Sequence, residues 1–191
     1  MADALATTDD VAAALGRDLT PSEVTSAEEH LDKTSDLFRL EARQQFTADE
    51  SRNRLKVTDG AVTLSQKPAT EIISVTCDWA QGQPVPHELF GQRLNVTGLT
   101  TGDYVRVHYK HGGTVPDLVR LTVAGIVAQL LEADPRAKAG VTQRGETRGP
   151  FSVQETYAAW AQGSSPRLAP DDVRVARSFR VRSYGSIIQG Y

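Results

Sequence analysis

The feature that most constrains the fold of this chain is the stretch from Thr114 to Asp134, TVPDLVRLTVAGIVAQLLEAD. In a helix, which turns about 100° per residue, its apolar residues form one stripe with two further residues beside it. Together these residues are Val119, Val123, Ile126, Val127, Leu130 and Leu131. Leu118 and Leu121 lie on another side, so the pattern predicts a helix buried on more than one face. Such a helix belongs in the middle of a large core or between subunits.

Helix starts are marked at three places. Thr114 is predicted to cap the apolar helix, with Pro116 among its first residues. Thr8, followed by two aspartates and later by Gly16, predicts a short helix that Thr8 caps and Gly16 ends. The run TPSE from Thr20 is a capping box, in which a threonine and the glutamate three residues later satisfy each other's backbone N–H groups.

The helix that starts at this capping box is predicted to continue to about Phe46, because no glycine or proline interrupts it. One face is apolar and consists of Val24, Ala27, Leu31, Phe38 and Ala42. Leu37 and Leu40 point elsewhere. The helix is therefore either loosely amphipathic or carries a second contact face between subunits.

The hydrophobic period changes from 3.6 to 2 in residues 51–111, which predicts strands. Asp59-Gly60 is predicted to be a hairpin turn between apolar residues on either side. Alternation also marks a strand with Ile73, Val75 and Cys77 on one face and a strand with Val105, Val107 and Tyr109 on one face. A weaker strand is expected at 93–96, and His87-Glu88 is read as part of a loop. These strands predict a small antiparallel sheet inserted between helices.

After the apolar helix, residues 140–150 are polar and glycine-rich and read as a loop, and residues 151–155 as an extended segment. A short helix containing the arginines is expected from Asp171 onward, before an apolar end. The predicted class is α+β, a helical core with an inserted antiparallel sheet and an extended C-terminal arm. Its segments are 1–50, 51–113, 114–165 and 166–191, all within one domain.

The residue types offer no recognisable catalytic, metal or cofactor site. The chain has one cysteine, and no phosphate-binding, dinucleotide-binding or nucleophile motif occurs. His108 and His111 are three residues apart on a strand and therefore point to different sides, and His87 has no second histidine at metalloprotease spacing. We therefore expect no enzyme, no cofactor and no metal. No stretch is apolar over the length of a bilayer span, so no membrane anchoring is expected.

Charge is unevenly distributed along the chain. Residues 1–50 contain 12 acids and 4 bases, whereas residues 167–191 contain 5 arginines and 2 aspartates. Aromatic residues lie among these arginines, as in a nucleic-acid patch, but the overall net charge of −3 favours an arm that docks onto a protein. The apolar residues Ile187, Ile188 and Tyr191 at the end of this arm also call for a partner.

Several stretches taken in order resemble the head-to-tail adaptor proteins of long-tailed phages, in particular those of phages infecting actinobacteria. The resemblance covers most of the chain and depends on ATTDDVAAALGRDLTPSE, VRVHYKHGGTVPDLVRLTVAGIVAQLL, GETRGPFSVQETYA and RSFRVRSYGSII. Such proteins often have Tyr-Thr-His-Gly before the proline of the central helix, where this chain has Tyr109-Lys110-His111-Gly112.

The resemblance implies a non-enzymatic virion protein that forms a ring, of twelve copies in this family, in the head-tail neck. Its partners would be other copies of itself, the portal, a tail-side stopper or head-closure protein, and genomic DNA that passes through the ring without sequence-specific binding. Assembly would take place in the host cytoplasm. A stopper protein is the closest alternative, and a small DNA-binding regulator is a further one.

Within this interpretation, residues of three kinds are candidate contact sites. The subunit-interface candidates are Leu37, Leu40, Leu118 and Leu121. The acids that could face the DNA channel, or alternatively form a solvated outer face, are Glu28, Asp32 and Asp36. The portal-binding arm, expected to be loose in the free protein and ordered on the portal, would use Arg177, Phe179, Arg180, Arg182, Tyr184, Ile187, Ile188 and Tyr191.

Overall fold

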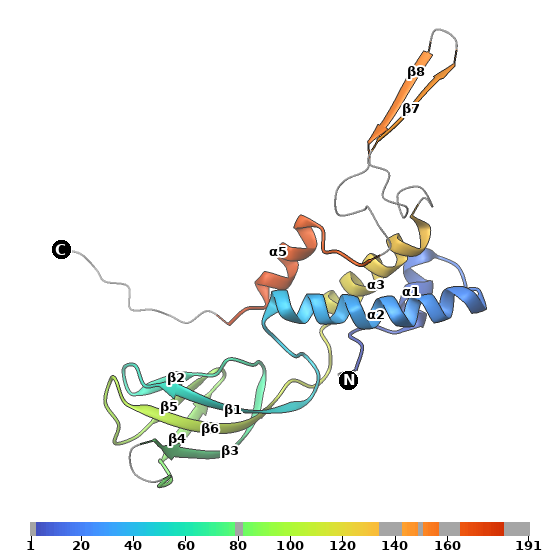
Figure 1. Cartoon of the computed structure of the whole chain (residues 1–191). Coiled ribbons are helices and arrows are strands. Elements are labelled where there is room, and N and C mark those ends of the chain that lie inside the picture. Colours follow the sequence, from blue (N-terminus) through green and yellow to red (C-terminus); the bar gives the residue numbers. More distant parts are fainter. Residues whose placement is uncertain (1–2, 79–81, 134–142, 149–150, 157–164, 182–191) are drawn as a thin grey trace, which may run out of the picture. The chain divides into compact units, whose positions relative to one another are not determined.

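The computed structural model describes residues 3–78, 82–133, 143–148, 151–156 and 165–181, and they form an α+β protein (Figure 1). The chain divides into two compact units. The helical unit comprises Met1–Glu41 and Pro116–Ser178, and the β unit comprises Ala42–Val115 together with Phe179–Tyr191. The predicted β insertion between helices is therefore confirmed, and each unit has its own buried residues.

Helix α1 (Thr8–Leu15) begins with a capping box one residue earlier than the sequence suggested. Thr7, not Thr8, is the N-cap, and its Oγ1 accepts a hydrogen bond from the Asp10 N–H at 3.2 Å. The Asp10 carboxylate in turn accepts the Thr7 N–H at 2.9 Å. Two adjacent threonines are chemically equivalent caps, and only the position of an acid three residues after Thr7 distinguishes them. Gly16 ends the helix with φ of 68°, as predicted.

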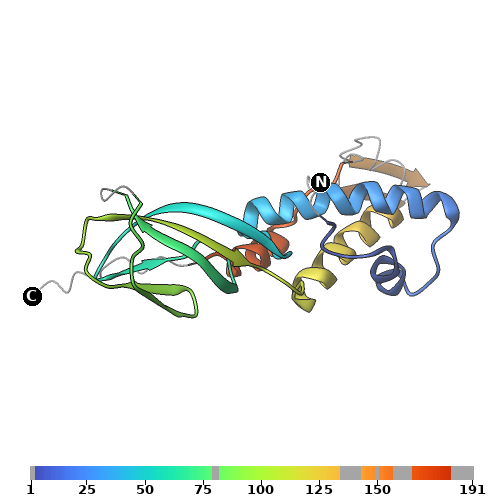
Figure 2. The same ribbon diagram turned by 90° about the horizontal axis from the view of Figure 1, so that it is seen from below.

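Helix α2 (Pro21–Ala42) is the long blue helix of Figures 1 and 2, and it begins at the predicted capping box. The Thr20 N–H donates to the Glu23 carboxylate at 2.9 Å, and the Glu23 N–H donates to Thr20 Oγ1 at 3.4 Å. Arg17 adds an ion pair to Glu23 at 2.7 Å. The predicted apolar face is buried at Ala27, Leu31, Phe38 and Ala42.

Helix α3 (Asp117–Glu132) is the predicted apolar helix, but Thr114 does not cap it. Pro116 occupies the N-cap position with extended backbone (ψ of 140°), and no side chain bonds to the helix start there. Thr114 lies two residues further out, and the Pro116 carbonyl instead accepts the N–H groups of Val119 and Arg120 at 2.9 and 3.0 Å. The buried face of α3 consists of Val119, Val123, Ala124, Ile126, Val127 and Ala128. It packs against α1 and also contacts α5 (Pro170–Ser178).

The C-terminal part of the helical unit differs from expectation in two places. Strand β7 (Gln143–Arg148) lies in a stretch that was predicted to be a loop, and it pairs with β8 (Phe151–Thr156), where an extended segment was expected. A polar, glycine-containing strand without alternating apolar residues gives no sequence signal. Helix α5 begins at Pro170 and ends at Ser178, so the arginine-containing helix does not include Arg180.

The β unit contains two three-stranded antiparallel sheets instead of one small sheet. The first sheet has the order β1 (Asp49–Lys56), β6 (Tyr104–His111), β3 (Ala69–Cys77), and the second has the order β2 (Ala61–Thr63), β5 (Arg93–Val96), β4 (His87–Phe90). The expected loop at His87-Glu88 is thus the start of a strand. One apolar cluster takes residues from both sheets, namely Val57, Val62, Leu64, Val75, Cys77, Val85, Leu94, Val96, Val105, Val107 and Tyr109.

The Asp59-Gly60 turn has the predicted positive φ values of 52° and 68°, but it does not close a hairpin ladder. Strand β1 before it pairs with β6, and β2 after it pairs with β5. Only a bridge between Thr58 and Ala61 joins the two sides. The turn therefore carries the chain from one sheet to the other.

Ile73 is exposed (41%), although its spacing from Val75 and Cys77 predicted that it would share their buried face. The register of β3 against β6 shifts between Ile72 and Ser74. Such an irregularity adds a residue on one strand and reverses the side on which the following residues lie. Ile72 therefore faces the core in place of Ile73.

Gly112 lies where the backbone closely approaches that of Phe46 and Thr47. A Cβ atom at this position would lie 2.1 Å from the Thr47 carbonyl oxygen, and φ is 76°. The next residue, Gly113, donates its N–H to the Phe46 carbonyl at 3.1 Å. A side chain at 112 would therefore meet backbone that cannot move without breaking this contact.

We predict that Gly112→Ala lowers the free energy of unfolding of the β unit by at least about 3 kcal/mol, because the clash adds to the cost of left-handed backbone. Gly98→Ala is the matched control, since Gly98 has φ of 82° but open space around its Cβ position. The control should lose only about 1 to 2 kcal/mol. Urea unfolding of both variants measures the difference, and equal losses would contradict a steric role for position 112.

The capping box of α2 predicts a pH dependence. The pKa of Glu23 is lowered to about 2, first by the hydrogen bond from Arg17 and then by those from Thr20. Because this pKa is below its ordinary value of 4.5, the stabilisation is complete above pH 4.5 and is lost as the pH falls through about 2. The melting temperature of the wild type should therefore exceed that of Glu23→Gln above pH 4.5, and the difference should shrink toward pH 2.

Glu28→Gln is the control for this experiment. Glu28 is exposed on the same helix, and its carboxylate has no ion pair to another described residue. A difference for Glu23→Gln that stays constant between these pH values, or equals that of the control, would rule out the capping contribution.

Candidate assembly surfaces

Among the described residues of the helical unit, three large apolar side chains are exposed. Leu118 and Leu121 of α3 are 54% and 57% exposed, and Leu40 of α2 is 75% exposed. The two α3 leucines lie one turn apart on the side of the helix away from its valine stripe. Leu37, the fourth candidate taken from the sequence, is half-buried. The unit therefore presents apolar surface on two helices.

The candidate acidic residues lie at intervals of four along α2, a spacing that places them on one side of the helix. Glu28, Asp32 and Asp36 are all exposed. Asp36 lies 3.5 Å from Arg39, whose buried guanidinium also donates to the Asp3 carbonyl. Glu28 and Asp32 have no ion pair to another described residue, so this stripe keeps most of its negative charge.

An ion pair that the sequence did not suggest joins α1 to α3. Arg120 donates to the Asp10 carboxylate and, at 3.2 Å, to Asp117. Burial acts to raise the pKa of Asp10, but the hydrogen bonds from Thr7 and the Arg120 charge together lower it. Asp10 therefore serves both the helix cap and the contact between helices, a double role that a sequence pattern does not reveal.

Only the first part of the candidate C-terminal arm lies among the described residues. Arg177 donates to the Glu41 carboxylate at 2.6 Å, so it already has a partner within the helical unit. Phe179 packs edge to face against Phe46, with ring centroids 5.4 Å apart. Arg180 is half-buried and interacts within the chain. The remaining candidates, Arg182, Tyr184, Ile187, Ile188 and Tyr191, lie outside the described residues.

The two histidines at the end of β6 point to opposite sides of the sheet, as their spacing predicted. The Nε2 of His108 lies 2.9 Å from the Glu50 carboxylate on the outer face. His111 is buried, and its Nε2 lies 2.8 Å from Ser51 Oγ. Burial lowers the pKa of His111. In the described part of the chain, no three His, Cys, Asp or Glu side chains are grouped to hold a metal.

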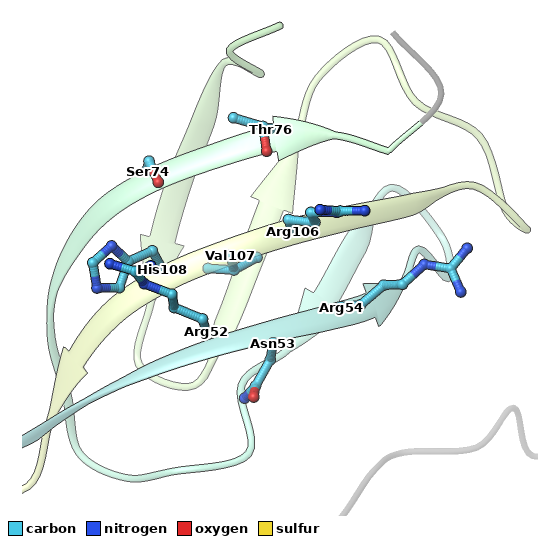
Figure 3. A pocket seen from close by; sticks show the side chains of 8 residues that line it. All are labelled: Arg52, Asn53, Arg54, Ser74, Thr76, Arg106, Val107 and His108. Atoms are coloured by element: carbon cyan, nitrogen blue, oxygen red, sulfur yellow. The ribbon is translucent and has the colours of Figure 1, made fainter. Parts of the chain in front are cut away.

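A groove of about 570 Å³ lies on the outer face of the sheet β1-β6-β3 (Figure 3). Its lining comes from all three strands and consists of Arg52, Asn53, Arg54, Ser74, Thr76, Arg106, Val107 and His108. Sequence reasoning missed this site: it considered His108 only as a zinc ligand and rejected that role. The available signal was the alternation of basic with inward-facing residues in RNRLK and in VRVHYK.

No helix among the described residues combines the length and apolarity needed to cross a bilayer. No protein-family model matches the chain, and no curated protein matches it. A solved structure described as "Neck of empty GTA particle computed with C6 symmetry" has a TM-score of 0.53 at 15% identity, covering 94% of this chain and 91% of that chain. Another, "Neck of native GTA particle computed with C12 symmetry", has a TM-score of 0.48 at 16% identity, covering 97% and 98%. The first likeness indicates a shared fold.

Proposed function

We propose that this protein is a structural, non-enzymatic neck component of a phage-like particle, a head-to-tail adaptor that assembles into a ring. The observation that carries the proposal is the likeness of fold to a neck protein of an empty GTA particle over 94% of this chain and 91% of that one. The actinobacteriophage adaptor resemblance of the sequence supports the same role. A stopper protein is the closest alternative, but stoppers are mainly β, and the helical unit favours an adaptor.

The exposed leucines support assembly through the helical unit. Leu118, Leu121 and Leu40 are each more than half exposed, on helices that each bury a different apolar face in the core. Burying such a side chain contributes up to about 1.5 to 3 kcal/mol, so a contact that covers all three is substantial. In a closed ring one face of each copy meets a different face of the next, and every contact is repeated around the ring. We propose twelve copies, as the family resemblance implies.

The ring would lie between the portal and a tail-side stopper or head-closure protein, with DNA passing through it. We propose that the stripe of Glu28, Asp32 and Asp36 faces this channel. Like charges repel the phosphates, so DNA can slide past such a surface without being retained. The alternative is that these acids form a solvated outer face, in which case α2 would lie on the outside of the ring.

We propose that the C-terminal arm binds the portal. Its arginines would pair with carboxylates of the partner, and Ile187, Ile188 and Tyr191 would supply apolar contact. Because Arg177 already pairs with Glu41, the contribution of this arginine to the portal would require an exchange of partners. The arginines further along the arm, Arg180 and Arg182, and the aromatic Phe179 and Tyr184 complete the proposed contact.

The ring proposal predicts that the double variant Leu118→Glu/Leu121→Glu loses self-assembly, because two charges would be buried in an apolar contact. The dissociation constant between copies should rise at least about a hundredfold. Leu118→Met/Leu121→Met is the matched control, since it keeps apolar side chains of similar volume and should still assemble. Native mass measurement, with and without a portal, reports the species formed.

Electron microscopy of the wild-type ring, alone or on a portal, would show whether α2 faces the channel or the outer surface. A wild-type chain that forms no ring alone or on a portal contradicts the ring, and assembly of the glutamate variant contradicts the leucine contact. A ring map with α2 on its outer surface rejects the channel-facing stripe.

Deletion of residues 185–191 should abolish capture of the protein by a portal while leaving the helical unit folded. The deletion removes the apolar anchor but none of the described helices. Capture is measured with immobilised portal, and helix content by circular dichroism. Undiminished capture would show that the end of the arm is not the anchor.

A further inference from the structure

The outer face of the sheet β1-β6-β3 concentrates positive charge at paired positions. Arg52 lies opposite His108, and Arg54 lies opposite Arg106, in the register of β1 against β6. Like charges directly opposite each other destabilise a sheet unless something compensates them. Among the described residues, Asp78 supplies the carboxylate that pairs with both Arg54 and Arg106.

Asp78 holds both guanidinium groups in place. Its Oδ2 accepts from Arg54 Nε at 2.8 Å and its Oδ1 from Arg106 Nε at 2.8 Å, and these hydrogen bonds, Arg106 first, lower the pKa of the carboxyl. Arg54 also stacks on the Tyr104 ring at 4.1 Å. One carboxylate thus positions two cations and leaves a positive charge and several N–H donors available.

Arg52 adds a third cation at the groove. It is exposed, and it has no ion pair to another described residue. Two acids of this sheet already have basic partners: Glu50 lies 2.9 Å from His108, which lines the groove, and Glu71 pairs with Lys110 at 2.9 Å. Arg52 is therefore available to bind an anion from another molecule. Ser74 and Thr76 on β3 add hydroxyl groups along its other side, as Figure 3 shows.

The spacing of the cations fits an extended chain. Arg52 and Arg54 lie two residues apart on one strand and so repeat at about 7 Å. An extended peptide repeats its side chains on one side at the same interval, so acids at alternate positions would meet them in turn. Duplex DNA instead carries one charge per about 1.7 Å and would bring other phosphates against Glu50, Glu71 and Asp78.

We propose that this groove is a docking site for an extended acidic segment of another protein, in which carboxylates recur at every second residue. Arg52 would meet one carboxylate, and the pair of Arg54 and Arg106, which lie opposite each other and are both held by Asp78, would meet the next. The site belongs to the β unit and does not require ring formation. Its test therefore uses ring-free protein and can fail separately from the proposed function.

The experiment measures fluorescence anisotropy of a labelled octapeptide of alternating glutamate and serine against the full-length protein. The wild type should bind this peptide, and a peptide with glutamine in place of glutamate should bind at least about tenfold more weakly. Arg52→Ala and Arg106→Ala should each weaken binding about tenfold. Arg93→Ala is the matched control, because Arg93 is an exposed arginine on β5 in the other sheet, and it should bind as the wild type does.

Arg52→Ala is the decisive variant, since Arg52 has no ion pair to lose within the described chain, and an unchanged melting temperature verifies its fold. Unchanged binding by this variant, or an equal loss in Arg93→Ala, would overturn the proposal. So would equal affinity for the glutamine peptide. Tighter binding of a labelled ten-base-pair duplex at the same ionic strength would assign the groove to nucleic acid instead.

Discussion

Burial of one face of α3 is the interaction on which the helical unit depends. Val119, Val123 and Val127 are fully buried, and each contributes about 1.5 to 3 kcal/mol relative to an exposed position. The face packs on α1, which lies more than a hundred residues earlier in the chain, and the Asp10–Arg120 ion pair aligns the two helices. Because a helix has more than one side, the fully used valine face leaves Leu118 and Leu121 outside. The packing that builds the core thus also creates the apolar surface proposed for assembly.

Local chemistry predicted much of the fold. The capping box at Thr20, the terminating Gly16 and the alternation along β6 each depend on neighbouring residues alone, and each was found where expected. Pairing depends on distant residues and was not predictable. The Asp59-Gly60 turn has the right dihedral angles, yet the strands on either side join different sheets, and the bulge in β3 turns Ile73 outward.

The candidate surfaces also differ in whether they depend on neighbouring residues or on distant ones. The exposed leucines were accessible to sequence reasoning because α3 has more apolar residues than one buried face requires. The arginine groove was not, since three strands contribute to it and the register that places Arg54 opposite Arg106 is a tertiary property. Asp78 carries no local signal either, because its role is defined by two arginines that are 24 and 28 residues away in sequence.

The hydrogen bond between Gly113 N–H and the Phe46 carbonyl joins the two ends of the β insertion at 3.1 Å. The chain therefore enters and leaves the insertion at neighbouring points, as close together as the two ends of a tight turn. The entropic cost of closing a loop grows only slowly with the length of the loop. Such geometry makes the β insertion between Phe46 and Gly113 a module, which evolution can enlarge or replace without rerouting the chain on either side of it.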